Sequence, residues 1–336
     1  MKNNSDLLNS LAVVLALIVA FYLPYESFLY AYAILGPLHY LTEINWVRDK
    51  GFFVKAKRKW LILVILITIG IVLPKIYFTY FLTDGKTSFL FIGFSLFDQY
   101  SNGLIFLALI LTWLFIAESI SVKVKAIIVV LALILAVLLN TYPLYLVVIG
   151  LLIPTVVHVY IFTLLFMLSG GLKKKTSWPF VNIGVLALIP LLIAFIPFDF
   201  AGYQSSSFIK NSFLDIHFHH TNVLFSKFLG LSDGTSFYFY ENLELRMQVF
   251  LSFAYIHHYL NWFVKTSMIG WHKSIDYKRG SYILIIWVSL VALFLTNYKL
   301  GFYAALSLSF LHVLLEFPIN LRSIRQIGSS LKSKTI

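Results

Sequence analysis

Residues 245–272 have the sequence LRMQVFLSFAYIHHYLNWFVKTSMIGWH. A membrane-spanning helix needs about 20 mostly apolar residues, and this stretch is long enough to provide them. Near its middle it carries two adjacent histidines, His257 and His258, with Asn261 one helical turn further on. Ionisable side chains are costly in hydrocarbon, so those found there usually face the protein interior and serve a function. The stretch predicts a membrane helix with one functional face, although a hydrogen bond to a neighbouring helix would also explain either histidine.

The composition is that of an integral membrane protein. Of the 336 residues, 60% are hydrophobic and 12% are charged, whereas a globular domain is about half apolar and a quarter charged. The net charge of +12 comes from short basic clusters between apolar runs, which is typical of cytoplasmic loops and argues against nucleic acid as a partner. We expect one transmembrane helical domain over residues 1–327 in the lipid bilayer, followed by a disordered tail over 328–336.

Hydropathy predicts an all-α bundle of about ten spanning helices. The expected spans are 8–24, 27–47, 61–82, 89–117, 124–141, 143–169, 178–198, 245–268, 281–298 and 301–320. The fourth is interrupted by polar residues between Asp98 and Gly103, so we expect it to be broken or to follow a re-entrant piece. Basic residues cluster after every second span, around 48–59, 123–125, 173–175, 273–279 and 322–334. By the positive-inside rule both termini are cytoplasmic.

The one long outer connection, 199–244, is too polar to span a membrane. Its apolar residues predict a short amphipathic helix that lies on the outer surface or caps the bundle. It also contains His217, His219 and His220. Neighbouring histidines in a polar loop form a possible second, outer metal site, but solvated histidines are the commoner explanation.

Histidines on three other stretches fall at the same depth as His257 and His258. Counting the rise per residue from the outer face places all five slightly to the cytoplasmic side of the midplane: His39, His158, His257, His258 and His312. Neutral imidazole is a common ligand for iron, zinc and copper, so the pattern predicts a shared metal site. A hydrogen-bonded or proton-conducting histidine network is the alternative.

Two of these helices also carry a carboxylate one turn after the histidine. Glu43 follows His39 and Glu316 follows His312 by four residues, and such positions share a helix face. Metal-bound histidines usually donate their second N–H to a carboxylate or carbonyl. Glu43 and Glu316 therefore suit ligand orientation or proton transfer, although contacts with basic residues at the membrane interface are the alternative.

The absence of cysteine narrows the chemistry. A chain without thiols has no disulfide, thiolate ligand, iron–sulfur cluster or covalently attached haem. A buried histidine site suits non-haem iron better than copper or zinc, with haem b as a further alternative. Aromatic and polar residues near the histidines predict a pocket for a lipophilic small-molecule substrate, lined by Tyr40, Tyr160, Tyr255, Tyr259, Asn261 and Trp262.

One segment resembles a known family. GPLHYLTE, residues 36–43, resembles the Gly-x-Pro-His-Gly-Ala-x-Asp signature of bacterial integral-membrane β-carotene-cleaving dioxygenases, which form retinal. The histidine and the acidic residue four positions later match at His39 and Glu43. The proline is displaced by one position, and Tyr40 replaces the family glycine. The resemblance covers this stretch and the general layout, and it implies a polytopic enzyme of the bacterial inner membrane with iron held by several intramembrane histidines.

These observations predict a membrane-embedded metal oxygenase, a dioxygenase or monooxygenase, that acts on a lipophilic substrate such as a carotenoid or another lipid. A transporter or channel that uses the same histidines and glutamates as a proton or ion relay is the second hypothesis. A b-type haem protein is the third.

Overall fold

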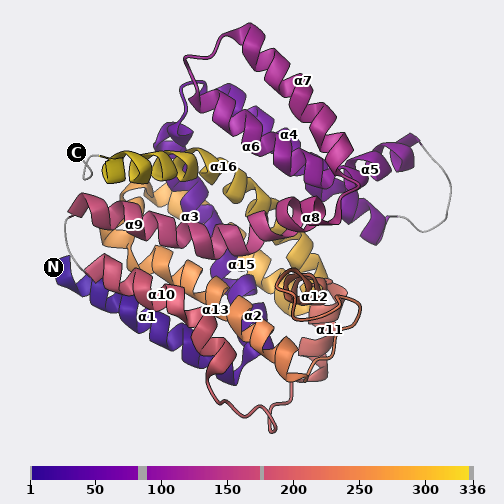
Figure 1. The fold of residues 1–336 in the computed structure, drawn as a ribbon, viewed down its shortest axis with the longest axis vertical. Helices are drawn as coiled ribbons and strands as arrows, with labels where there is room; N and C mark the ends of the chain where they lie inside the picture. Colours follow the sequence, from indigo (N-terminus) through magenta and orange to yellow (C-terminus); the bar gives the residue numbers. More distant parts are fainter. Residues whose placement is uncertain (1, 82–88, 175–177, 333–336) are drawn as a thin grey trace.

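The computed structural model describes residues 2–81, 89–174 and 178–332, and every regular element in these ranges is helical (Figure 1). Two of the elements, η1 and η3, are π-helical, and η2 and η4 are short 3₁₀ helices. In chain order the elements are α1 (Lys2–Tyr22), α2 (Pro24–Tyr30), η1 (Ala31–Leu35), α3 (Gly36–Asp49), η2 (Gly51–Phe53), α4 (Lys57–Tyr80), α5 (Phe89–Gln99), α6 (Ser101–Ile116), α7 (Val122–Leu139), α8 (Pro143–Tyr145), η3 (Leu146–Phe162), α9 (Thr163–Lys174), α10 (Trp178–Phe195), α11 (Ser207–Asp215), α12 (His219–Phe228), α13 (Asn242–Val264), α14 (Thr266–Ile269), η4 (Trp271–Ser274), α15 (Tyr277–Thr296) and α16 (Tyr298–Lys332).

Long apolar helices indicate an integral membrane protein. Within the described ranges, six helices are long and apolar enough to cross a membrane, and a bent pair would make a seventh. The bent pair is α5 and α6, which meet at an angle of 61°. This break confirms the interruption predicted in the fourth span. The total of ten crossings and the cytoplasmic location of the termini stay predictions, and residues 84–87 of one expected outer connection lie outside the described residues.

The long helices α13 and α16, which carry His258 and His312, lie in the middle of the bundle. Helix α13 packs against α1 and α2, and α16 packs against α3, α4, α9 and α15. Most side chains of α13 are buried, whereas α7 and α15 expose most of theirs. In a bilayer, lipid would cover these outer helices, and the polar residues of α3, α13 and α16 would be kept away from hydrocarbon.

Two of the spans that carry a histidine contain a π-helical segment, one just before the histidine and the other around it. The π-helical turn η1 lies directly before Gly36 and Pro37, and the longer π-helix η3 contains Pro154 and His158. Proline has no backbone N–H to donate, so it disturbs the regular hydrogen-bond ladder. A π-helical turn widens the helix and changes the direction in which the following side chains point, and such turns are frequent at functional sites.

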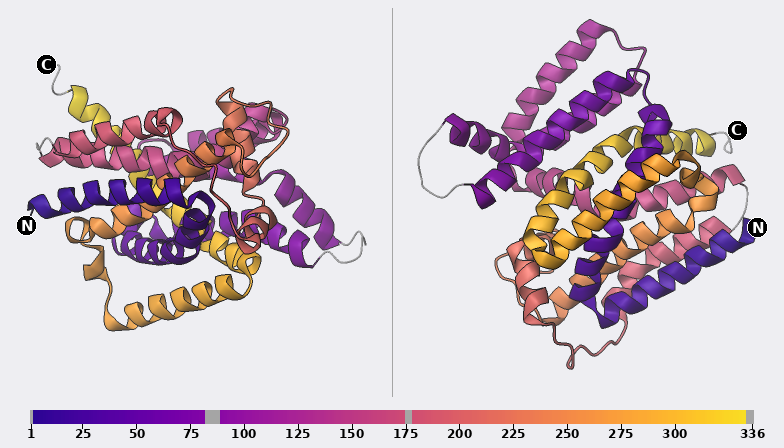
Figure 2. Two further views of the ribbon diagram at one scale, coloured as in Figure 1. Left: turned by 90° about the horizontal axis from the view of Figure 1, so that it is seen from below. Right: turned by 180° about the vertical axis from the view of Figure 1, so that it is seen from behind.

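The two ends of the bundle are built differently. Both termini lie at the same end in all three views, and α11 and α12 cover the opposite end (Figures 1 and 2). Two short helices therefore occupy the connection 199–244, where the sequence predicted one; that this connection lies outside stays a prediction. They cap the bundle, because Phe213 and Phe218 pack against Phe28 of α2.

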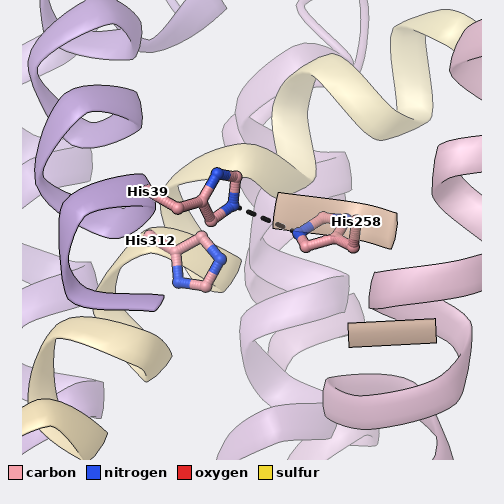
Figure 3. Close-up of side chains that lie close together, drawn as sticks. All are labelled: His39, His258 and His312. Carbon is pink, nitrogen blue, oxygen red and sulfur yellow. Dashed lines mark hydrogen bonds between the residues drawn. The ribbon is translucent and has the colours of Figure 1, made fainter. Parts of the chain in front are cut away.

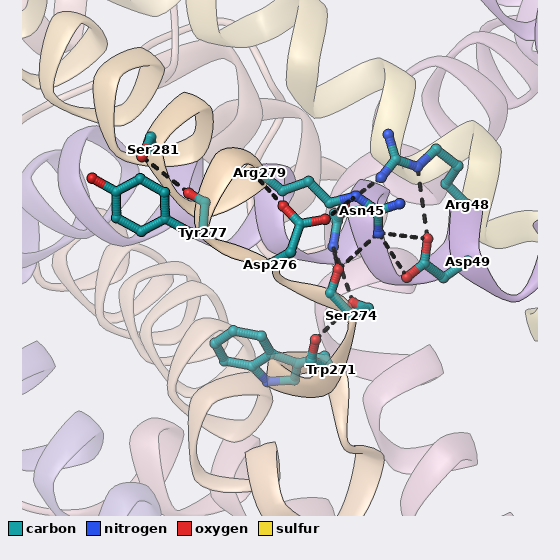
Figure 4. Close-up of polar contacts among 9 residues, drawn as sticks. All are labelled: Asn45, Arg48, Asp49, Trp271, Ser274, Asp276, Tyr277, Arg279 and Ser281. Carbon is teal, nitrogen blue, oxygen red and sulfur yellow. Dashed lines mark hydrogen bonds and ion pairs between the residues drawn. The ribbon is translucent and has the colours of Figure 1, made fainter.

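A polar cluster ties the connection between α13 and α15 to α3 (Figure 4). The guanidinium of Arg279 contacts Asp49 at 3.0 Å, Asp276 at 3.3 Å and the carbonyl of Ser274 at 2.8 Å. The side-chain amide of Asn45 also donates to the Ser274 carbonyl. The same connection carries Trp271 at the start of η4, and its indole N–H donates to the Trp262 carbonyl of α13 at 3.3 Å.

The last helix is longer than the sequence predicted. Helix α16 begins at Tyr298 and continues to Lys332, so residues 328–332 are helical, where we expected a disordered tail. Gly328 does not end the helix because an isolated glycine lowers helix stability by only about 1 kcal/mol. Residues 333–336 lie outside the described residues.

Candidate metal centre

Four histidines from four helical segments form a closed ring of imidazoles. They are His39 on α3, His258 on α13, His158 on η3 and His312 on α16. In that order around the ring, neighbouring ring centroids are 4.7, 5.1, 4.9 and 5.4 Å apart. All four side chains are buried. The structure thus brings together residues that are up to 273 positions apart in the sequence, as their common depth predicted.

Three of the four rings offer nitrogen atoms within reach of one ion. His39, His258 and His312 each provide a ring nitrogen within 4.8 Å of the other two (Figure 3). The Nε2 atoms of His39 and His258 are 3.1 Å apart, and those of His158 and His312 are 3.0 Å apart. With a metal–nitrogen bond of about 2.1 Å, two nitrogens at right angles around an ion are about 3.0 Å apart. The spacing fits adjacent ligands of one metal ion, and it equally fits hydrogen bonds between imidazoles.

The two predicted carboxylates both reach the ring, but only one contacts the histidine expected from the sequence. Glu43 Oε2 lies 3.1 Å from Nε2 of His39 on the same helix. Glu316 Oε2 lies 3.2 Å from Nδ1 of His158, on a different helix. The pairing of Glu316 with His312 was therefore wrong. Two side chains four residues apart share a helix face, but this does not require them to touch when a neighbouring helix offers a closer partner.

A threonine that the sequence analysis missed fixes the tautomer of His258. Thr163 Oγ1 donates to the Val159 carbonyl at 2.9 Å and lies 3.0 Å from His258 Nδ1. Because the hydroxyl proton is already donated, the oxygen accepts from Nδ1–H. His258 Nε2 then carries its lone pair toward the ring, as a metal ligand requires. The only sequence signal was that Thr163 follows His158 by five residues.

His257 lies outside the ring. Its imidazole stacks on Phe253 at 5.7 Å and 10°, and it belongs to neither histidine group found in the described residues. Adjacent residues on a helix point about 100° apart, so only one of the two can face the ring. The sequence left open which of the two adjacent histidines is a ligand, and the structure places only His258 in the ring.

A cavity of about 440 Å³ opens beside the ring. His39, His258, Glu43 and Glu316 line it on the ring side, and its size is typical of small-molecule pockets. Trp46, Phe166, Met167 and Trp262 are among its apolar wall residues, and Asn9, Thr163, Asn182, Asn261 and Lys265 among its polar ones. Of the predicted pocket residues, Asn261 and Trp262 line this cavity. Asn9, Asn182 and Lys265 were missed because each is a single polar residue beside or inside an apolar run.

The four predicted pocket tyrosines do not line this cavity. Tyr40 stacks on His312 at 4.3 Å, and its hydroxyl lies 2.7 Å from that of Tyr259. Tyr160 donates to the Leu186 carbonyl, and Tyr255 packs edge-on against Phe28. These side chains fill the core, and the hydroxyl groups of Tyr40, Tyr259 and Tyr160 are hydrogen-bonded there, as is usual for buried tyrosines. Their assignment to this pocket was wrong.

The outer histidines form a second group. His217, His219 and His220 also offer nitrogens within 4.8 Å of one another. His217 and His220 are exposed and His219 is half-buried, and His217 has a positive φ of 58°. Partial burial and the two neighbouring histidines lower the pKa of His219 to about 4. The outer group is therefore close-packed but accessible to water.

No family model matches this sequence, and no curated protein or solved structure is significantly similar to it. The function of the histidine ring is therefore inferred from its geometry.

Proposed function

We propose that the histidine ring binds a redox-active transition metal ion, iron in the first instance, and that the protein is a membrane-embedded oxygenase for a lipophilic substrate. One observation carries the proposal. Imidazoles from four helical segments meet at the spacing of adjacent ligands, buried beside a cavity large enough for a small molecule.

The chemistry of the donors favours iron or copper over other ions. Imidazole nitrogens without thiolates suit iron, copper and zinc, while magnesium and calcium prefer oxygen ligands. Burying four histidines is unfavourable unless their nitrogens are paired, and coordination of one ion pairs several of them at once. Structural zinc sites are commonly built with cysteine, which this chain does not contain.

The chain's own residues orient the ligands and exclude water. Thr163 accepts the Nδ1–H of His258 and so directs Nε2 of that ring inward. Glu316 Oε2 lies 3.2 Å from Nδ1 of His158, on the side of that ring away from Nε2. Glu43 Oε2 lies 3.1 Å from Nε2 of His39, the nitrogen that also faces His258, so Glu43 is placed as a further metal ligand or proton acceptor at that atom. Tyr40, hydrogen-bonded to Tyr259, holds the plane of His312 by stacking. Such supporting contacts set ring orientation and metal affinity.

A bound iron ion would supply an open coordination position at which dioxygen is activated. A dioxygenase reaction balances with dioxygen alone, because both oxygen atoms enter the product, whereas a monooxygenase also needs a two-electron reductant. The resemblance of residues 36–43 to carotenoid-cleaving enzymes rests on His39 and Glu43, which are in contact here. A polyene or another lipid is the substrate class that we propose.

A proton or ion relay is the second candidate, and one observation favours it. One chain of contacts passes through an imidazole: Glu316 lies 3.2 Å from Nδ1 of His158, and Nε2 of His158 lies 3.0 Å from His312. Glu43 and His258 also lie close to His39, but both contact its Nε2 atom at 3.1 Å. Such chains of titratable groups are typical of proton pathways in membranes. Haem b fits less well, because nitrogens 3.0–3.1 Å apart leave no room for a porphyrin between either pair.

Metal analysis of the full-length protein in detergent separates these functions. We expect about one iron per chain after reconstitution with ferrous iron under argon, no Soret band, and dioxygen uptake when β-carotene in micelles is added. His39→Ala and His312→Ala should each lose the metal. A Soret band would assign the site to haem. A chain that binds no metal would overturn the oxygenase proposal and leave the relay.

A further inference from the structure

The cavity beside the histidine ring has a second set of polar groups that the ring does not use. Asn9 of α1, Asn182 of α10 and Asn261 of α13 all line it. Helices α1 and α10 contribute no histidine to the ring, so these amides extend the cavity away from it. Asn182 already accepts a hydrogen bond from Ser10 at 2.9 Å. The other two asparagines have unused hydrogen-bonding atoms.

Asn9 is the clearest case. Its side chain is only 2% exposed, and neither Nδ2 nor Oδ1 has a hydrogen-bond partner in the structure. In Asn261, Oδ1 is buried without a partner. More than nine in ten buried polar groups in folded proteins are paired, so an unpaired amide beside a cavity needs an explanation. One explanation is a bound molecule that supplies the missing hydrogen-bond partners.

The unpaired atoms specify what that partner must offer. If the amide of Asn9 were flipped, so that its oxygen and nitrogen exchanged places, the number of unpaired donors and acceptors would stay the same, because both atoms are unpaired. Asn9 and Asn261, which both line the cavity, therefore have one amide donor group and two carbonyl acceptors without partners. An alkane would leave all three unpaired. A carboxylate only accepts hydrogen bonds, so it would leave both acceptors unpaired, whereas a hydroxyl donates to one of the acceptors and also accepts from the amide donor.

The cavity also has room for a hydrocarbon chain next to such a group. Trp46, Trp262, Phe166 and Met167 give it apolar walls, and the volume of about 440 Å³ reaches His39 and His258. Pockets of this kind typically combine apolar walls with a few placed polar groups that fix the orientation of the ligand.

We propose that this cavity binds a long-chain lipid alcohol, with its hydroxyl group held by Asn9 and Asn261 and its chain directed along the apolar wall to the histidine ring. The part of this inference that places the chain at a reactive metal rests on the proposed function. The binding of the hydroxyl group does not, so the two can be tested separately.

Lys265 offers the competing explanation. It lines the same cavity, and an ammonium group would favour a carboxylate head group over an alcohol. The experiment must therefore compare three head groups on one chain.

The test uses the full-length protein in detergent and three probes of equal chain length: 9,10-dibromooctadecanol, 9,10-dibromooctadecanoic acid and 9,10-dibromooctadecane. Bromine quenches tryptophan fluorescence on contact, so a probe in the cavity quenches Trp46 and Trp262. The difference between the wild type and a Trp46→Phe variant separates this signal from quenching of tryptophans that face the detergent. We expect the alcohol to bind at least about tenfold more tightly than the acid or the alkane, because each of these two probes makes fewer hydrogen bonds with the asparagines.

Asn9→Leu keeps the size of the side chain and removes both amide atoms. We expect it to weaken alcohol binding about tenfold or more, while alkane binding stays equal or improves and the metal content is unchanged. Asn222→Leu is the matched control. Asn222 is also buried and has an unpaired Oδ1, but it lies on α12 outside this cavity.

Equal binding of alcohol and alkane by the wild-type protein would overturn the inference and assign the unpaired amides to water. Tighter binding of the acid would also overturn it and assign the head group to Lys265. Alcohol selectivity in a protein that binds no metal would uphold this inference and remove the oxygenase proposal. Metal binding without selectivity for the alcohol would overturn this inference and leave the oxygenase proposal in place.

Discussion

Two groups of histidines in this chain meet the same geometric criterion, with three ligand nitrogens within 4.8 Å of one another. They differ in everything around those nitrogens. The inner group is buried on three separate helices and adjoins a fourth histidine, two carboxylates and a cavity. The outer group, His217, His219 and His220, comes from four consecutive residues and is largely exposed.

The comparison shows why proximity alone does not define a metal site. Water can hydrogen-bond to the exposed imidazoles of His217 and His220, so these two need no ion. Buried imidazoles must find partners within the protein or in a bound ion, because an unpaired polar group in a low-dielectric interior is costly. The inner group is also held by Thr163, Glu316 and Tyr40, whereas in the outer group His219 packs against the ring of Phe237.

The largest expected difference is between two adjacent residues of the inner region. His258→Ala should reduce metal affinity by more than about 100-fold, beyond the range typical for supporting contacts alone. His257→Ala is the matched control, since His257 is equally buried on the same helix but lies outside the ring. Iron per chain, measured by mass spectrometry after dialysis, gives the result. Loss of metal in His257→Ala with retention in His258→Ala would reverse our assignment.

The next effect concerns the carboxylate that the sequence paired with the wrong histidine. Glu316→Gln should weaken metal binding by about 10- to 100-fold, as is usual for a group that orients a ligand. If Glu316 acts through His158, the same change made in a His158→Ala background should add little. A competition titration with a chelator measures both. Full additivity of the two changes would mean that Glu316 acts elsewhere.

Replacing the whole outer group should hardly change the inner one. We expect the variant with alanine at 217, 219 and 220 to keep the iron content and the chelator competition of the wild type within about twofold, because well-separated sites behave independently. Loss of inner metal in this variant would contradict the separation of the two groups. If the wild type binds a second metal ion per chain more weakly, and this variant does not, the outer group also binds metal.

The smallest effect is the pH dependence of the outer group in metal-free buffer. The pKa of His219 falls from 6.5 to about 4 in the folded chain, so between these values the unfolded state binds more protons than the folded state. Stability contributed by neutral His219 is complete above pH 6.5 and is lost as the pH falls toward 4. Thermal unfolding at pH 7 and pH 5 should therefore show a smaller loss of Tm for His219→Asn than for the wild type. An equal loss would place His219 in water.

Periodicity and depth predicted more of this molecule than local motifs did. The break between α5 and α6 followed from polar residues inside an apolar run, and the convergence of four histidines followed from their common distance along helices that run in one direction. Each depends on properties that a sequence carries directly, namely hydropathy and rise per residue.

The failures concern contacts between helices. The choice of His258 over His257, the reach of Glu316 to His158 and the unpaired amides of Asn9 all depend on how each helix is rotated against its neighbours. The π-helical turns of η1 and η3 change that rotation, and no simple sequence period reports it. The tyrosines were misplaced for the same reason, since an aromatic residue near a site fills the core as readily as it lines a pocket.

X-ray absorption at the edge of the bound metal tests most directly whether imidazoles from separate helices share one ion. For reconstituted full-length protein in detergent we predict three or four nitrogen neighbours at about 2.1 Å, with the multiple-scattering pattern of imidazole, and one imidazole fewer in a His312→Ala variant that still holds metal at high concentration. A first shell with fewer than two imidazoles, or one unchanged by His39→Ala and His312→Ala together, would contradict a shared metal centre.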